Sequence, residues 1–232
     1  MTTNVHFLCA GAAQGLVKAL QDGFAAETGA MLQGRFGAVG AMKEALLAGE
    51  PCDLMVVTAA MIDALVADGL LRADSRAALG RVRTGVASRS GLPVPDVATP
   101  DALRAALRAA DAIYFPDPVR ATAGIHFAKV MRELGVHDEL APRFRTFPNG
   151  ATSMRELAAS RDARPIGCTQ VSEILYSPGV ALAGILPADF ELSTEYTAAI
   201  SARAAQPALA AQFLARLAGP ASKALRAEGG FE

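Results

Sequence analysis

The sequence predicts an α/β protein with two lobes. Short apolar runs typical of strands alternate with apolar residues at helical spacing, which favours mostly parallel sheets with helices on both faces. This order starts again near Arg81 with no Gly- or Pro-rich linker before it, which indicates lobes joined by crossing strands. The chain has 232 residues, 52% of them hydrophobic, so it is long enough to bury a sizeable core.

Three strand-helix pairs are expected in the first third of the chain. The strands cover residues 5–10, 31–36 and 53–57, which are short and apolar. The helices follow them, with apolar residues such as Leu16, Leu20 and Phe24 at helical spacing. Glycines at 29, 49 and 69 end these helices, as is typical of helix C-termini.

The middle and end of the chain continue the pattern. Strands are expected over residues 82–88, 112–115, 165–170 and 194–201, and helices over 101–109, 123–134, 154–159 and 207–217. Residues 91–99 carry two prolines and are expected to form a loop. In such sheets, ligands bind beyond the carboxyl ends of strands. Here those ends are the turns at 10–14, 36–40 and 58–59.

Composition excludes several classes of function. The net charge is −1 with no basic stripe, so neither a nucleic acid nor insertion into a membrane is expected. The three cysteines show no C-x-x-C spacing and no histidine cluster accompanies them, so no metal, cofactor or disulfide framework is expected. The sequence also lacks a G-x-G-x-x-G turn, a P-loop and a G-x-S-x-G nucleophile motif.

The N-terminal segment bears on location. Residues 5–10 are apolar, but no Lys or Arg precedes them and they continue into a helix pattern, unlike a signal peptide. The chain as given is therefore expected in the cytoplasm, or in the periplasm if a leader has been removed.

The order of several motifs carries a family resemblance. These motifs are FAAETG at 24–29, FGAVG at 36–40, GEPCDLMVVT at 49–58, Asp117-Pro118, AGIHFAK at 123–129 followed by Leu134-Gly135, and PIG at 165–167. In this order the chain resembles the molybdate-binding branch of the type II periplasmic solute-binding proteins over nearly its whole length.

That resemblance implies a type II periplasmic-binding-protein fold, with each lobe a mixed sheet flanked by helices and a ligand cleft between the lobes. Residues 1–80 and 194–232 would form the first lobe and residues 81–193 the second, with two hinge crossings. The ligand would be a small anion held by backbone N–H groups and hydroxyls at helix N-termini, where unpaired donors and a partial positive charge lie. An ABC transporter permease would be a partner if the protein is exported.

The sequence departs from the molybdate-binding pattern at three places. Molybdate binders of this family carry serines in the first two turns and a tyrosine near the last strand. Here the turns at 9–13 and 36–40 have no hydroxyl, and Gln170 stands where the tyrosine is expected. Each charge-assisted donor is worth about 1.5–3 kcal/mol, so these departures favour another anion.

Arg120 favours a carboxylate ligand. It precedes the helix expected from residue 123, and a guanidinium binds a carboxylate bidentately; a solvated loop arginine is the alternative. Thr122 is either an N-cap or a ligand donor. The predicted ligand-binding residues are Gly11, Ala12, Ala13, Gly37, Ala38, Val39, Thr58, Arg120, Ala121, Thr122, Thr152, Thr169 and Gln170.

A second hypothesis is an enzyme. The segment GCTQVSEIL at 167–175 is similar to a subgroup that includes aconitate isomerase, which is built on the same fold. Such a reaction shifts a double bond in an unsaturated di- or tricarboxylate and needs one acid/base group. The candidate catalytic residues are His126 and Glu173; the alternatives are a core histidine and a glutamate that favours a helix start.

Overall fold

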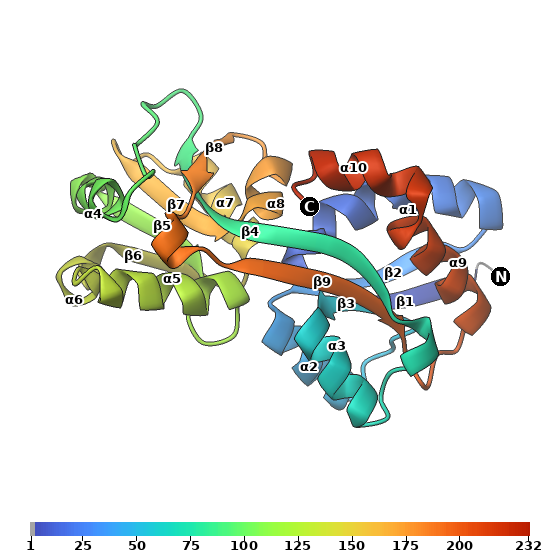
Figure 1. Cartoon of the computed structure of the whole chain (residues 1–232). Helices are drawn as coiled ribbons and strands as arrows, with labels where there is room; N and C mark the ends of the chain where they lie inside the picture. The colour runs from blue at the N-terminus through green and yellow to red at the C-terminus, as the bar shows by residue number, and fades with distance from the viewer. Residues whose placement is uncertain (1–2) are drawn as a thin grey trace. The chain divides into compact units, whose positions relative to one another are not determined.

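Strands and helices alternate along most of the chain (Figure 1). In this computed structural model, which describes residues 3–232, the chain divides into two units. The first holds the chain up to Arg81 and the segment Thr194–Glu232, and the second is Val82–Ser193. The chain therefore passes from one unit to the other twice, once within strand β4 and once within strand β9.

The first unit is built from strands and helices in alternation. Its elements are β1 (Asn4–Ala10), η1 (Gly11–Ala13), α1 (Gln14–Thr28), β2 (Met31–Gly37), α2 (Val39–Leu47), β3 (Leu54–Thr58), α3 (Ala59–Ala67), η2 (Ala73–Ser75), the start of β4 (Ala77–Arg89), most of β9 (Ser193–Ile200), α9 (Pro207–Ala218), η5 (Pro220–Ser222) and α10 (Lys223–Glu228).

The sheet of this unit is mixed. β1 pairs in parallel with β2 on one side and β3 on the other, and β9 returns antiparallel to β3. Most residues of β1 and β3 are buried, because helices cover this sheet. On one face, Phe24 of α1 packs edge-on against Phe213 of α9, with ring centroids 5.1 Å apart. This contact ties the C-terminal segment to the start of the chain.

The second unit contains the remaining elements. They are the rest of β4, α4 (Pro100–Ala109), β5 (Ala112–Pro116), α5 (Thr122–Glu133), α6 (His137–Leu140), η3 (Ala141–Arg143), β6 (Phe144–Phe147), α7 (Gly150–Ala159), β7 (Pro165–Gln170), α8 (Val171–Tyr176), β8 (Val180–Ile185) and η4 (Ala188–Phe190).

This second sheet is also mixed and is covered on both faces. β5 pairs in parallel with β6 and β7, whereas β4 runs antiparallel to β7 and β8. Successive strand residues point to opposite faces, so Val86 joins the core under α4 and α5 while Ala87 joins the core under α7 and α8. The predicted α/β class with mixed, helix-flanked sheets is confirmed.

The structure adds elements that the sequence prediction lacked. β6 has only four residues, two of them polar, so it shows no continuous apolar run. β8 is a continuous apolar run that the sequence prediction left unassigned. α6 and α10 are short, with four and six residues. β4 begins at Ala77, before the predicted start at residue 82. None of the helices over residues 3–232 is long and apolar enough to span a membrane.

Candidate functional site

Two helical segments of the first unit begin directly after strands and have apolar residues at their starts. η1, which leads into α1, follows Ala10, and α2 follows Ala38. Within residues 3–232, no side chain accepts a capping hydrogen bond at the start of η1 or of α2. Ala12, Ala38 and Val39 are buried. Backbone N–H groups at helix starts need partners when water is excluded, so these starts are suited to bind an anion.

Thr58, at the end of β3, differs from these uncapped starts because it caps a helix. It is the N-cap of α3, and its hydroxyl oxygen accepts a hydrogen bond from the Met61 backbone N–H at 3.4 Å. That hydroxyl therefore stabilises its own helix.

In the second unit, the turn after β5 leads into α5. The Asp117 Oδ1 atom accepts hydrogen bonds from the backbone N–H groups of Val119, at 2.7 Å, and Arg120, at 3.1 Å. These bonds fix the turn that carries the exposed Arg120 side chain. A Cβ atom on Gly124 would lie 2.2 Å from the Pro116 carbonyl oxygen, so only glycine lets α5 pack this closely on the turn.

The start of α5 resembles those of η1 and α2. Its N-cap is Ala121, which is buried, and Thr122 is already the first helical residue. No side chain within residues 3–232 caps this start. Thr122 is therefore not the N-cap, and the alternative raised by the sequence, that it donates to a ligand, stays a prediction.

Glu173 lies in a buried polar cluster. It is 5% exposed, and its carboxylate accepts hydrogen bonds from the Thr169 hydroxyl and from the backbone N–H groups of Gly150, Ala151 and Gln170. Burial raises the pKa of Glu173 above its ordinary value, and the four hydrogen bonds oppose that rise. The sequence singled out Glu173 and Thr169 but gave no sign of Gly150 and Ala151, which lie about twenty positions away.

Thr152 lies next to this cluster, in the first turn of α7. Its backbone N–H donates to the side-chain oxygen of Asn149, the N-cap of α7, at 2.8 Å. The sequence contained a signal for this cap, since Asn149 precedes a helical pattern.

Gln170 ends β7 opposite Thr84 of β4 and is buried. The side-chain amide is oriented so that both its oxygen and its nitrogen have suitable hydrogen-bond partners. In this orientation the nitrogen donates to the carbonyl oxygens of Val82, at 3.2 Å, and Arg83, at 3.3 Å. Gln170 therefore holds the end of β7 against β4.

His126, the other proposed proton carrier, is half-buried on α5. Its Nε2 atom lies 2.7 Å from the carbonyl oxygen of Phe190, which can only accept, so Nε2 carries the proton and donates. His126 thus ties α5 to η4.

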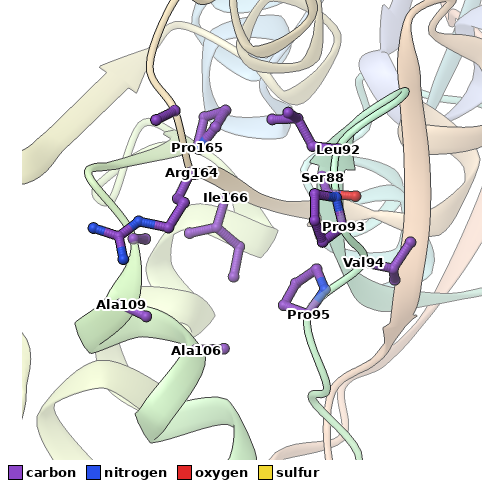
Figure 2. A pocket seen from close by; sticks show the side chains of 12 residues that line it. Ser88, Leu92, Pro93, Val94, Pro95, Ala106, Ala109, Arg164, Pro165 and Ile166 are labelled. Carbon is purple, nitrogen blue, oxygen red and sulfur yellow. The ribbon is translucent and has the colours of Figure 1, made fainter.

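A cavity of about 230 Å³ lies elsewhere in the second unit (Figure 2). It is lined mainly by apolar side chains from the loop after β4, the end of α4 and the start of β7, including Pro93, Pro95, Ala106 and Ile166. It contains none of the predicted ligand-binding residues and lies at the opposite end of β7 from Gln170. Apart from Ser88 and Arg164, the residues that line it are apolar.

The sequence matches the family model of the bacterial extracellular solute-binding proteins over residues 5–232. The chain belongs to this family. The predicted resemblance to molybdate-binding proteins is confirmed for the fold: the periplasmic molybdate-binding protein of Azotobacter vinelandii superposes with a TM-score of 0.82 and 19% identity, covering 98% of each chain.

Two further relatives are informative. The sulfate-binding protein SubI of Mycobacterium tuberculosis has a TM-score of 0.74 and 16% identity, and the alignment covers 99% of this chain and 86% of that one. A protein of a Pseudomonas species named aconitate isomerase is 27% identical over 191 residues, covering 82% of this chain and 71% of the relative. The structural matches establish the fold, and the sequence match connects the chain to a protein named as an enzyme.

Proposed function

We propose that this solute-binding protein binds a small organic anion, a di- or tricarboxylate, and delivers it to a transporter of the ABC class. One observation carries the proposal: three helical starts, those of η1, α2 and α5, have apolar cap residues and no capping side chain within residues 3–232. Their backbone N–H groups, together with Arg120, are the proposed ligand donors.

A carboxylate is favoured over a tetrahedral oxyanion by the side chains at these starts. The starts of η1 and α2 offer backbone amides and no hydroxyl. Arg120 supplies a planar pair of N–H donors that matches a carboxylate. Its backbone is fixed by Asp117, which lowers the cost of placing the guanidinium at a ligand.

A thermal-shift screen tests this function. The panel contains molybdate, sulfate, phosphate and a set of di- and tricarboxylates that includes cis- and trans-aconitate. A ligand that binds the folded state raises the melting temperature once its concentration exceeds its dissociation constant. We expect carboxylates to raise it and R120A to weaken that binding about 10- to 100-fold, as loss of a charge-assisted contact of about 1.5–3 kcal/mol implies.

The control is R132A, which removes an exposed arginine from the last turn of α5, the helix that follows Arg120. R132A should bind carboxylates as the wild type does. A shift with molybdate alone would overturn the carboxylate assignment, and no shift with any anion in the panel would overturn anion binding itself.

A second candidate function is isomerisation of an unsaturated carboxylate. The sequence match to a protein named aconitate isomerase favours it. Glu173 supports the chemistry because burial raises its pKa toward the range of a general acid or base. His126 is the other proposed proton carrier, through Nδ1, because Nε2 is held by the Phe190 carbonyl.

Proton NMR in D2O distinguishes an enzyme from a binding protein. A double-bond shift would convert one aconitate isomer into the other and exchange a substrate proton for deuterium. E173Q or H126N should abolish the conversion, and H137N, which alters a partly exposed histidine at the start of α6, should not. Binding without conversion by the wild type would leave the chain a binding protein.

A further inference from the structure

The cluster around Glu173 uses donors that would otherwise be offered to a ligand. The Thr169 hydroxyl proton points to Glu173, because the carboxylate oxygen can only accept. The backbone N–H groups of Gly150 and Ala151, in the first turn of the ten-residue helix α7, bind the same carboxylate. Thr169 is fully buried, so its hydroxyl does not exchange this partner for water.

The carboxylate also fills the space in front of these donors. A Cβ atom built on Gly150 would lie 1.9 Å from the Glu173 Oε2 atom and 2.0 Å from the Thr169 Oγ1 atom. The residue at 150 therefore has to be glycine while the glutamate is in place. The fit is that of a carboxylate held against a backbone amide and a hydroxyl, with no room for a second group.

We propose that Glu173 is a specificity-determining residue: its carboxylate acts as a built-in ligand that removes Thr169, Gly150 and Ala151 from the donors available to an outside anion. In this role it is a positioning residue that does not itself touch the ligand, unlike the proton carrier of the second candidate function. The consequence for specificity rests on the proposed function, since it leaves an anion to be bound by the uncapped helix starts and Arg120. Whether the Glu173 carboxylate acts as a built-in ligand can be tested without knowing the natural ligand of the protein.

Shortening the side chain should convert this cluster into a site for a small carboxylate. In E173A the three backbone N–H groups and the Thr169 hydroxyl lose their shared acceptor, while the space of the carboxylate becomes vacant. Formate supplies the same group as a free ion. We therefore expect the melting temperature of E173A to rise with sodium formate well beyond its rise with sodium chloride.

Three comparisons make this test specific. E173Q keeps the space filled and should show no formate-specific rise, and E133A, which removes an exposed glutamate from α5, controls for the loss of one negative charge. The double variant E173A/G150A should lose the rise, because the added Cβ occupies the vacated space. If formate stabilises E173A no more than it stabilises E133A, the proposal is overturned, whatever the screen shows for the wild type.

A second measurement keeps the proposal testable if E173A does not fold. In wild-type protein labelled with ¹³C at the glutamate side-chain carboxyl carbon, the signal that disappears in E173Q belongs to Glu173. At pH 8 we expect this signal at the position of an ionised carboxylate. A signal at the position of a protonated acid would overturn the role of Glu173 as a built-in anion.

Discussion

Asp53 and Gln206 are 153 residues apart in the sequence, yet the Asp53 Oδ1 atom accepts a hydrogen bond from the Gln206 backbone N–H at 2.8 Å. The second oxygen, Oδ2, accepts from the His6 backbone N–H at 2.7 Å. Asp53 is 1% exposed. One buried carboxylate thus joins β1 to the residue that precedes α9, and so fastens the C-terminal segment to the first unit.

Replacing Asp53 with asparagine should destabilise the first unit by about 2–3 kcal/mol, because one acceptor oxygen becomes an NH2 group that faces a backbone donor. Urea unfolding followed by circular dichroism measures the loss. D63N is the control, since Asp63 forms an exposed ion pair with Arg76, which is worth about 0–1 kcal/mol. A D53N protein as stable as D63N would contradict this role.

Much of the fold could be predicted from the sequence because its signals are local. The apolar run at 5–10 and the helical spacing of Leu16 and Phe24 correspond to β1 and α1. Gly29, in the left-handed conformation with φ of 69°, ends α1 as expected, since a side chain would be strained there. β6 lacked such a signal, because it has four residues and two of them are polar. β8 carries an apolar run that the prediction left unassigned.

The candidate site was less predictable, because its contacts join distant segments. Nothing in the sequence around Gly150 indicates that Glu173, more than twenty residues later, fills the space beside it. The family resemblance indicated that the turns at Ala38 and Ala121 belong to the site. The structure adds that α2 and α5, which begin at these turns, have no capping side chain within residues 3–232.

Replacing Gly124 with alanine should disturb the turn that carries Arg120. The added Cβ would lie 2.2 Å from the Pro116 carbonyl oxygen and 2.4 Å from that of Asp117, and backbone atoms cannot move aside easily. We expect a loss of about 1–3 kcal/mol in stability, together with weaker binding of any carboxylate found in the screen. Melting curves and titration calorimetry measure the two effects.

I125A provides the comparison for that variant. Ile125 is the next residue on α5, and its side chain is 47% exposed, so its removal should leave both stability and binding nearly unchanged. Equal effects of G124A and I125A would show that close packing of α5 on the turn does not matter.

The three cysteines should be unreactive in the folded protein. Burial raises the pKa of the Cys52 thiol to about 12, and it raises the pKa values of Cys9 and Cys168 as well. With a pKa of 12, only about one thiol in ten thousand is ionised at pH 8, and the thiolate is the reactive form. Ellman's reagent should therefore label no thiol at pH 8 until guanidinium chloride unfolds the chain, and then label all three. Rapid labelling without denaturant would contradict the buried positions.

The stability of the protein should depend on pH through Glu173. Burial raises the pKa of Glu173 above its ordinary value of 4.5, so the folded state binds this proton more tightly than the unfolded state does. The contribution of Glu173 to the free energy of unfolding is therefore greatest below pH 4.5. It decreases as the pH rises through the raised pKa, by about 1.4 kcal/mol for each unit of the rise.

E173Q isolates this effect, because it lacks the titrating group and keeps nearly the same size. The free energy of unfolding of the wild type minus that of E173Q should fall as the pH is raised from 4 to 8, and then level off once Glu173 is ionised. Urea denaturation at a series of pH values measures the difference. If the difference instead grows with pH, the hydrogen bonds from Thr169 and the three backbone N–H groups outweigh burial, and the pKa of Glu173 is lowered in the folded protein.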